Sequence, residues 1–173
     1  ELPPAYGAGE YLPSEDRMRS VRQALSGLGF SEAMTYSFID IENDDRFELA
    51  VAQGGNSGFV TLQDAVIDGA IRMRPTMIPG LLDAVRLNLN FQRRNLKLFE
   101  IGKSFIGGGE GQLPSEPRLL TIALTGAEVA ASTVADGRGL DLFDAKAAIE
   151  TVAATLGIVT PEFRLSNAKH LTI

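Results

Sequence analysis

The sequence predicts an α+β fold in which helices pack on a mainly antiparallel sheet. Three segments carry apolar residues at helical spacing, and the short alternating segments between them are typical of strands. Short loops join neighbouring strand segments more often than a helix separates them. Paired strands with such short connections favour an antiparallel sheet over a parallel one.

The composition is that of one ordinary globular domain. The chain has 173 residues, of which 45% are hydrophobic and 22% charged, so it can bury a core. No apolar run reaches the roughly 20 residues that a membrane-spanning helix needs, and we expect no membrane partner. The absence of cysteine excludes disulfides and thiolate chemistry and fits a cytoplasmic location. A net charge of −6 disfavours binding to DNA or broad attraction to nucleic acid.

The first helix and the segment before it are predicted from proline content and periodicity. Residues 1–13 predict a linker that leads into one core domain over residues 14–173. Ser14 can cap the first helix, and Gly29 is placed to end it. The predicted buried stripe of this helix is Met18, Val21, Leu25 and Leu28. Its opposite face carries arginines that we expect to be solvated or to face an acidic partner.

A strand and a hairpin are predicted to follow. Apolar and polar residues alternate over Met34–Ile39, which predicts a strand buried on at least one face. An acidic turn over residues 40–45 follows, and then two short strands around Ala50 and Val60. The Gly-rich segment 54–58 between them has the composition of a hairpin loop.

Two more helices and two more strands complete the predicted fold. Pro79 fits the first position of a second helix, which Arg93 and Arg94 close. The predicted buried side of that helix is Ile78, Leu82, Val85 and Leu89. Strands are predicted over residues 96–105 and 119–124, with Gly102 marking a bulge or a close approach.

The last helix has clear signals at both ends. Asp141 or Asp144 can cap its start, and Gly157 can end it. The apolar surface predicted for this helix comprises Phe143, Ala147, Ile149 and Leu156.

Three candidate chemical sites are weak. The acidic run over residues 40–45 lacks the glycine and glutamate that an EF-hand loop needs at its sixth and twelfth positions, so a solvated turn explains it better. Gly102-Lys103-Ser104 resembles the end of a phosphate-binding loop, but the required earlier glycine is Lys97. His170 is the single histidine and has no evident partner for acid–base work. We therefore predict no catalytic, cofactor-binding or metal-binding residue.

The segment Arg72–Gly80 is unusual, because two arginines stand beside two prolines at a helix start. One interpretation is a stiff loop that leads into the helix. The alternative is an anion or partner contact by Arg72 or Arg74, since a helix N-terminus favours anions.

Four motifs in this chain carry a family resemblance. They are Gly29-Phe-Ser-Glu-Ala-Met-Thr-Tyr-Ser-Phe38, Met73-Arg-Pro-Thr-Met-Ile-Pro-Gly-Leu-Leu82, Leu98-Phe-Glu-Ile-Gly-Lys-Ser-Phe105 and Leu140-Asp-Leu-Phe-Asp-Ala-Lys146. In this order they resemble motifs of bacterial-type phenylalanyl-tRNA synthetase β subunits, over most of residues 14–156. The chain departs from the family at Asp64-Ala65, where Asn-Pro is usual, and at Pro75, where threonine is usual.

The resemblance implies a class II aminoacyl-tRNA synthetase-like fold, an antiparallel sheet flanked by helices, in a copy that is not catalytic. It implies an assembly role beside the α subunit in a cytoplasmic heterotetramer that charges tRNA, with ATP and Mg used elsewhere in the complex. No Phe-Arg-x-Glu strand and no Gly-x-Gly-x-x-Arg motif is present to hold ATP. The predicted partner interface comprises Arg17, Arg22, Tyr36, Phe38, Arg72, Arg74 and Pro79. An active adenylate-forming ligase and an unrelated protein-binding domain stay open as alternatives.

Overall fold

A three-stranded sheet lies at the centre of the computed structural model, which describes residues 12–42, 59–64, 69–107, 112–129, 137–159 and 161–164. Its strands are β1 (Ser31–Glu32), β4 (Leu96–Lys103) and β5 (Arg118–Thr125), in that order across the sheet. β4 and β5 pair antiparallel along their whole length, whereas β1 runs parallel to β4. Two small antiparallel ladders pair β2 (Phe38–Ile39) with β3 (Arg72–Met73) and β6 (Ala127–Val129) with β7 (Arg138–Gly139). The prediction of a mainly antiparallel sheet is confirmed, with β1 as its parallel exception.

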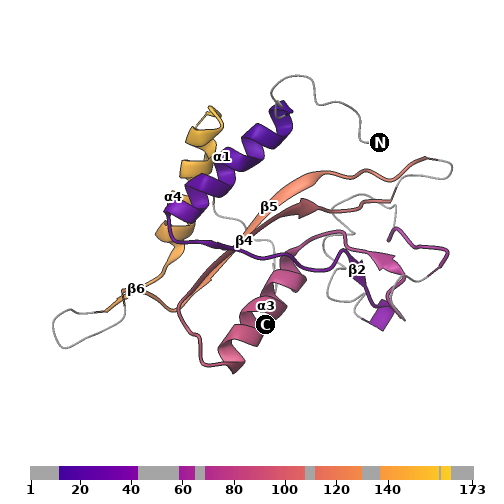
Figure 1. Ribbon diagram of the computed structural model, residues 1–173, viewed down its shortest axis with the longest axis horizontal. Helices are drawn as coiled ribbons and strands as arrows, with labels where there is room; N and C mark the ends of the chain where they lie inside the picture. The colour runs from indigo at the N-terminus through magenta and orange to yellow at the C-terminus, as the bar shows by residue number, and fades with distance from the viewer. Residues whose placement is uncertain are drawn as a thin grey trace, which may run out of the picture.

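Helices cover both faces of this sheet (Figure 1). α1 (Pro13–Gly27) and α4 (Leu142–Thr155) lie on one face, and α3 (Ile78–Asn90) lies on the other. Side chains alternate along β4 and thereby supply both layers, because successive residues of a strand point to opposite faces. Phe99 joins the α1–α4 layer, while Glu100 points to the opposite side.

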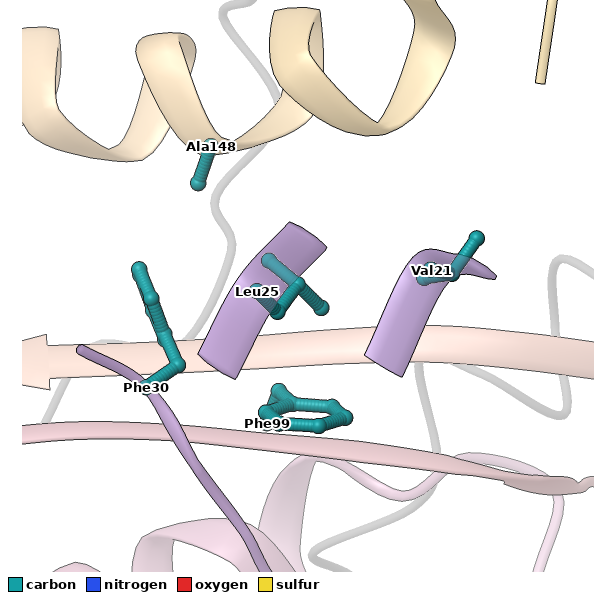
Figure 2. Packing of buried hydrophobic residues seen from close by; sticks show 5 residues of the cluster. All are labelled: Val21, Leu25, Phe30, Phe99 and Ala148. Carbon is teal, nitrogen blue, oxygen red and sulfur yellow. The ribbon is translucent and has the colours of Figure 1, made fainter. Parts of the chain in front are cut away.

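The main core forms where α1 and α4 pack on β4 and β5. Phe99 is fully buried beneath Val21 and Leu25 of α1 (Figure 2). Phe30, which follows α1, and Ala148 of α4 lie beside them. The partly buried Leu120, Ile122 and Leu124 of β5 complete this layer. Each fully buried side chain of this size contributes about 1.5–3 kcal/mol relative to its exposed state.

α1 begins two residues earlier than predicted and ends where expected. Pro13 stands in its first turn, and Leu12 precedes it without a side-chain cap, so the prediction that Ser14 caps the helix is wrong. Proline needs no N–H there and has its φ already set for a helix. At the other end Gly29 has φ +81°, and Phe30 N–H donates to the carbonyl of Leu25 at 3.0 Å. This Schellman turn confirms the predicted end and carries Phe30 into the core.

α4 is confirmed with its predicted cap and stop. Asp141 accepts from the N–H groups of Phe143 and Asp144, and Asp144 accepts in return from the N–H of Asp141. Gly157, with φ +66°, follows the last turn. The predicted apolar surface is only partly internal, since Ala148 and Ala153 are the buried residues while Phe143 is 73% exposed.

α3 presents a different face to the core from the one predicted. Pro79 lies in its first turn at the second helical position, because the helix begins at Ile78 after Met77. Met77 and Leu81 are buried, whereas Ile78 and Leu89 are 40% and 42% exposed. Leu82 and Val85 are half-buried. Arg93 and Arg94 lie beyond the helix, which ends at Asn90.

The remaining predictions divide between confirmed strands and residues outside the described ranges. β4 and β5 match the predicted strands to within two residues at each end. The predicted strand Met34–Ile39 is interrupted: β1 ends at Glu32 and β2 begins at Phe38. Thr61 near the predicted Val60 strand forms one bridge with Arg72. The predicted strand at Ala50, the loop 54–58 and His170 lie outside the described residues.

Gln92 provides a test of the turn that ends α3. Its φ is +60°, and it follows Phe91 as Gly29 follows Leu28 at the end of α1. A side chain in the left-handed region costs about 1–2 kcal/mol, which glycine avoids. We expect Gln92→Gly to raise the free energy of unfolding by about 0.5–1 kcal/mol, measured by urea denaturation. Gly29→Ala is the matched control: it should lower stability by about 1 kcal/mol, because no atom lies near the added carbon and only conformation changes. A loss of stability in Gln92→Gly would contradict this account.

Candidate functional site

The most constrained polar group in the described residues is Arg74, which is 4% exposed. Its Nη1 donates to Glu100 Oε1 at 2.7 Å and to Thr35 Oγ1 at 2.8 Å. The same nitrogen lies 3.2 Å from the carbonyl oxygen of Thr35, and Nε donates to the carbonyl of Lys103 at 3.1 Å. Glu100, 3% exposed, accepts a further bond from the Thr35 hydroxyl at 2.7 Å. We call Thr35, Arg74 and Glu100 the Arg74 cluster.

Two glycines leave the space that this cluster occupies. A Cβ at Gly102 would lie 2.5 Å from Arg74 Nη2 and 2.8 Å from the sulfur of Met77. A Cβ at Gly80, in the first turn of α3, would lie 2.7 Å from Thr35 Oγ1. The predicted close approach at Gly102 is therefore confirmed, and its partner is the guanidinium.

The cluster joins three segments that are distant in sequence. Thr35 belongs to the extended segment between β1 and β2, Arg74 follows β3, and Glu100 lies in β4. Backbone bonds reinforce the junction, since Arg74 N–H donates to the carbonyl of Ser37 and Phe105 N–H donates to the carbonyl of Arg74, both at 2.9 Å. Paired and hydrogen-bonded burial is the arrangement in which buried charges are tolerated. Chemically the cluster is a structural junction, because acceptors of the same chain already bind Nη1 and Nε of the guanidinium.

Two residues of the predicted partner interface are internal. Arg74 is held as described above, and Pro79 is buried at the start of α3. Neither side chain lies on the surface of this fold, so an interface there would draw on the remaining five residues. The partner interface as a whole stays a prediction.

Three further residues of that set lie beside the cluster. Phe38 is half-buried and pairs with Met73 across the β2–β3 ladder. Arg72 donates to Thr61 Oγ1 and stands over the ring of Phe59, 5.3 Å from its centroid. Tyr36 is 78% exposed. The structure therefore brings Tyr36, Phe38 and Arg72 to the same junction as Arg74 and Pro79.

The two predicted arginines of α1 lie apart from that junction. Arg17 is exposed and donates to the carbonyl of Pro13 within its own helix. Arg22 forms a salt bridge with Glu32 of β1 at 2.8 Å, which ties the helix to the following strand. Such half-exposed pairs contribute little to stability, at about 0–1 kcal/mol.

Sequence reasoning missed Thr35, Glu100 and Gly80 as partners of Arg74, although each lies in a motif quoted for the family resemblance. A glutamate within an apolar strand segment was the available signal, because an acidic residue there needs a buried partner. Met34, which the predicted interface leaves out, is 92% exposed and thus more exposed than Tyr36. Alternation places Met34 and Tyr36 outward when Thr35 points inward.

A second charged group stands where α4 begins. Lys97 pairs with Glu128 and donates to the carbonyl of Leu28, the last residue of the α1 turn, while Arg138 pairs with Asp144 at 2.8 Å. The hydrogen bond from Arg138 and that from the Asp141 N–H lower the pKa of Asp144 to about 2. These ion pairs orient β4, β6 and β7 against α4.

The described residues contain neither a metal-binding cluster nor a membrane-spanning helix. No group of three or more His, Cys, Asp or Glu side chains in those ranges is arranged to hold a metal ion. None of the helices within them is long and apolar enough to cross a membrane.

The Arg74 cluster predicts a characteristic thermodynamic cycle. We expect Arg74→Met and Glu100→Leu each to lower the free energy of unfolding by about 3–5 kcal/mol, because each leaves a buried charge without its partner. The double variant leaves neither charge and should cost clearly less than the sum of the single changes. Urea denaturation of the four proteins measures this coupling. Additive losses would show that the pair does not interact as described.

Gly102 supplies a separate test of the packing. We expect Gly102→Ala to lower stability by about 1–3 kcal/mol, because the new methyl group displaces Arg74 or Met77 from a filled site. Ser104→Ala is the control, since Ser104 is fully buried two residues away and its hydroxyl has no hydrogen-bond partner. Removing that hydroxyl should change stability by no more than about 0.5 kcal/mol or improve it. Equal stability of Gly102→Ala and the unmodified chain would contradict the close approach.

Comparison with protein families matches residues 1–172 to the phenylalanyl tRNA synthetase beta chain CLM domain. The phenylalanine–tRNA ligase beta subunit of Desulfotalea psychrophila is 33% identical over 148 residues, covering 83% of this chain and 18% of the relative. That of Geobacter sulfurreducens is 34% identical over 134 residues, covering 78% of this chain and 17% of the relative. The chain thus spans less than a fifth of the length of these relatives.

Solved structures show the same fold at lower identity. A pyrrolysyl tRNA synthetase of Desulfitobacterium hafniense superposes with a TM-score of 0.60 at 17% identity, over 92% of this chain and 50% of that one. An ATP phosphoribosyltransferase regulatory subunit/histidyl-tRNA synthetase of Bacillus halodurans gives a TM-score of 0.57 at 16% identity, over 90% and 38%. These likenesses confirm the class II aminoacyl-tRNA synthetase-like fold, and the sequence matches identify the lineage within it: this chain belongs to the phenylalanyl-tRNA synthetase β-chain family.

Proposed function

We propose that this domain is a non-catalytic assembly module of a cytoplasmic phenylalanine–tRNA ligase, which packs against the α subunit that activates phenylalanine. The observation that carries the proposal is the division of the family motifs between inside and outside. Arg74, Glu100 and Gly102 serve the interior, while Met34 and Tyr36, on the motif that contains Thr35, project from the surface. Both lie in the extended segment between β1 and β2, and we call them the Met34–Tyr36 surface.

The Met34–Tyr36 surface suits a permanent protein contact. Met34 and Tyr36 are 92% and 78% exposed, and aromatic residues and methionine are enriched in interfaces. Thr35 lies between them in the Arg74 cluster, so the backbone that presents them is fixed from inside. A surface presented by rigid backbone loses little entropy on binding. The Arg22–Glu32 salt bridge flanks the same segment.

The charge pattern supports a role without ATP, Mg or direct tRNA binding in this domain. Transfer of an adenylyl or phosphoryl group needs positioned cations to stabilise the developing charge. The guanidinium of Arg74 is occupied by Glu100, Thr35 and Lys103. The net charge of −6 is also opposite in sign to what tRNA phosphates attract, so the rest of the complex must supply the phosphate contacts.

Binding to the α subunit is the direct test. We expect Met34→Asp and Tyr36→Asp each to weaken the complex between this chain and the α subunit of the same species at least tenfold, which corresponds to about 1.4 kcal/mol. Titration calorimetry or surface plasmon resonance at low salt measures the affinity. Leu113→Asp is the matched control, because Leu113 is 90% exposed and belongs to the connection between β4 and β5. Its affinity should be unchanged.

Two outcomes would overturn the proposal. Absence of any complex with the α subunit at low salt would remove the assembly role. Phenylalanine-dependent ATP–pyrophosphate exchange by the chain alone would show an active adenylate-forming site instead. The exchange assay is the sharper of the two, because it needs no partner.

A further inference from the structure

A groove opens where α1 and the end of α4 meet β4 and β5. Its volume is about 380 Å³. Sites for small molecules in proteins have volumes of roughly 300–1,000 Å³, and they combine apolar walls with a few polar groups that orient the ligand. The apolar wall of this groove comprises Met18, Val21, Ile101, Leu120, Val152 and Leu156. The groove therefore has the size and the wall of a small-molecule site.

Helical spacing decides which residues of α1 face the groove. Arg17, Met18 and Val21 lie three, four and seven residues after Ser14, so these four residues share one side of the helix. Residues one or two positions apart do not face each other, and the acidic residues 15 and 16 of the first turn therefore belong to other sides. The helix thus presents an arginine and two apolar side chains to the groove, with no carboxylate among them.

The sheet supplies a second arginine to the same groove. Arg118 is the first residue of β5, and alternation places it on the same face as Leu120. It pairs in register with Lys103 of β4, whose ammonium is bonded to Glu116 at 2.7 Å, so these two charges offset each other. The charged side chains that line the groove are therefore Arg17 and Arg118, and we call it the cationic groove.

Both guanidinium groups have donors to offer. Arg17 donates through Nε to the carbonyl of Pro13 at 3.2 Å, so its two Nη nitrogens remain for a ligand. Within the described ranges the side chain of Arg118 has no ion-pair partner. Arginine binds a carboxylate or a phosphate through two parallel N–H···O bonds, which fix the position of the anion. Two such groups at one groove also reverse the local sign of charge in a chain of net charge −6.

Two other grooves lack this unbalanced charge. The groove between α3 and β5, of about 420 Å³, is lined by apolar residues and threonine. The groove at the end of α1, of about 480 Å³, contains Lys97, Glu128 and Asp144. There Lys97 is bonded to Glu128, and Asp144 is bonded to Arg138. Partners in the same chain thus satisfy its charges, whereas the cationic groove keeps two positive groups beside an apolar wall.

We propose that the cationic groove binds a small amphipathic anion, an apolar chain that ends in a carboxylate or a phosphate. Arg17 from α1 and Arg118 from β5 bind the head group, and the wall formed by Met18, Leu120 and Leu156 receives the apolar chain. Charge selects the head group, because a cation at the same place would meet two like charges. Size selects a small molecule, because a specific protein contact covers roughly 800 Å² of each partner and is not confined to one groove.

The inference goes beyond the assembly role and uses neither Met34 nor Tyr36. The ligand would contact the first turns of α1, the end of α4 and the start of β5 together. Its binding is therefore expected to stabilise the packing of both helices on this face of the sheet, since a ligand that binds only the folded chain shifts the folding equilibrium toward it.

Titration of the complete 173-residue chain with defined amphiphiles tests the site. We expect decanoate and decyl phosphate, below the concentrations at which they form micelles, to cause saturable NMR shifts of the amides of Met18, Val21 and Leu120. The stronger of the two ligands identifies the preferred head group. Decyltrimethylammonium, with the same chain and a cationic head, should cause no saturable shift, and neither should acetate, which lacks the chain.

Arginine variants locate the head group. We expect the double variant Arg17→Gln and Arg118→Gln to weaken binding of the better anion at least about tenfold, because charge-assisted hydrogen bonds are lost. Arg86→Gln is the matched control: it removes the same charge from α3, where the side chain is 76% exposed beside Asp83, and should leave the affinity unchanged. Unchanged urea denaturation of the double variant ensures that a loss of binding reports on the groove and not on folding.

Three outcomes would overturn the proposal. Equal binding of decyltrimethylammonium would show an apolar surface without selection by charge. An equal effect of Arg86→Gln would show general attraction of anions to the chain. Shifts of these amides by the α subunit, with none from either anion, would assign the groove to a protein contact. Binding of the anions requires no α subunit, so this proposal and the assembly role can fail separately.

Discussion

The burial of Arg74 beside Glu100 is the constraint on which the rest of the fold depends. Both groups are less than 5% exposed, and burying unpaired charges costs several kcal/mol for each ion. That cost is offset only if every partner arrives together, which requires Thr35, the Lys103 carbonyl and the space above Gly102. One local arrangement therefore fixes the strand pairing, the start of α3 and the path of the chain between β1 and β2. This coupling favours a single fold, because a shift of any one segment would leave a buried charge without its partner.

The same constraint explains what could and could not be predicted from the sequence. Periodicity and end signals predicted α1, α4, β4 and β5, because these elements owe their limits to local groups such as Gly29 and the Asp141–Asp144 capping box. The interruption of the strand at Met34–Ile39 could not be predicted in this way. There the carbonyl of Thr35 bonds to Arg74, so the regular ladder ends after the Ala33–Phe99 bond. A contact between residues far apart in sequence decided the local structure.

α3 shows a second kind of limit. The sequence predicted its apolar stripe as the buried side of the helix, but periodicity does not say which residues of the stripe this domain buries itself. Leu81 faces the sheet within this chain, while Ile78 and Leu89 stay partly open. Met34, Tyr36 and Phe143 show similar excess exposure. Single exposed apolar residues are ordinary and need no explanation, whereas a contiguous apolar surface is typical of a contact site. Exposed apolar residues of this kind are what the proposed assembly role requires.

The Arg74 cluster also bears on the proposal that this domain carries out no ligase chemistry. A nucleotide phosphate could bind Nη1 of Arg74 only by displacing Glu100, which would leave that carboxylate buried without a cation. The penalty for an isolated buried charge is of the order of 3–5 kcal/mol, which exceeds the gain of about 1.5–3 kcal/mol from a hydrogen bond to a charged group. An arginine held in this way serves the fold, and its Nη1 is not available to bind a phosphate. The residues that identify the family are therefore those that the fold requires, and their presence alone carries no information about catalysis.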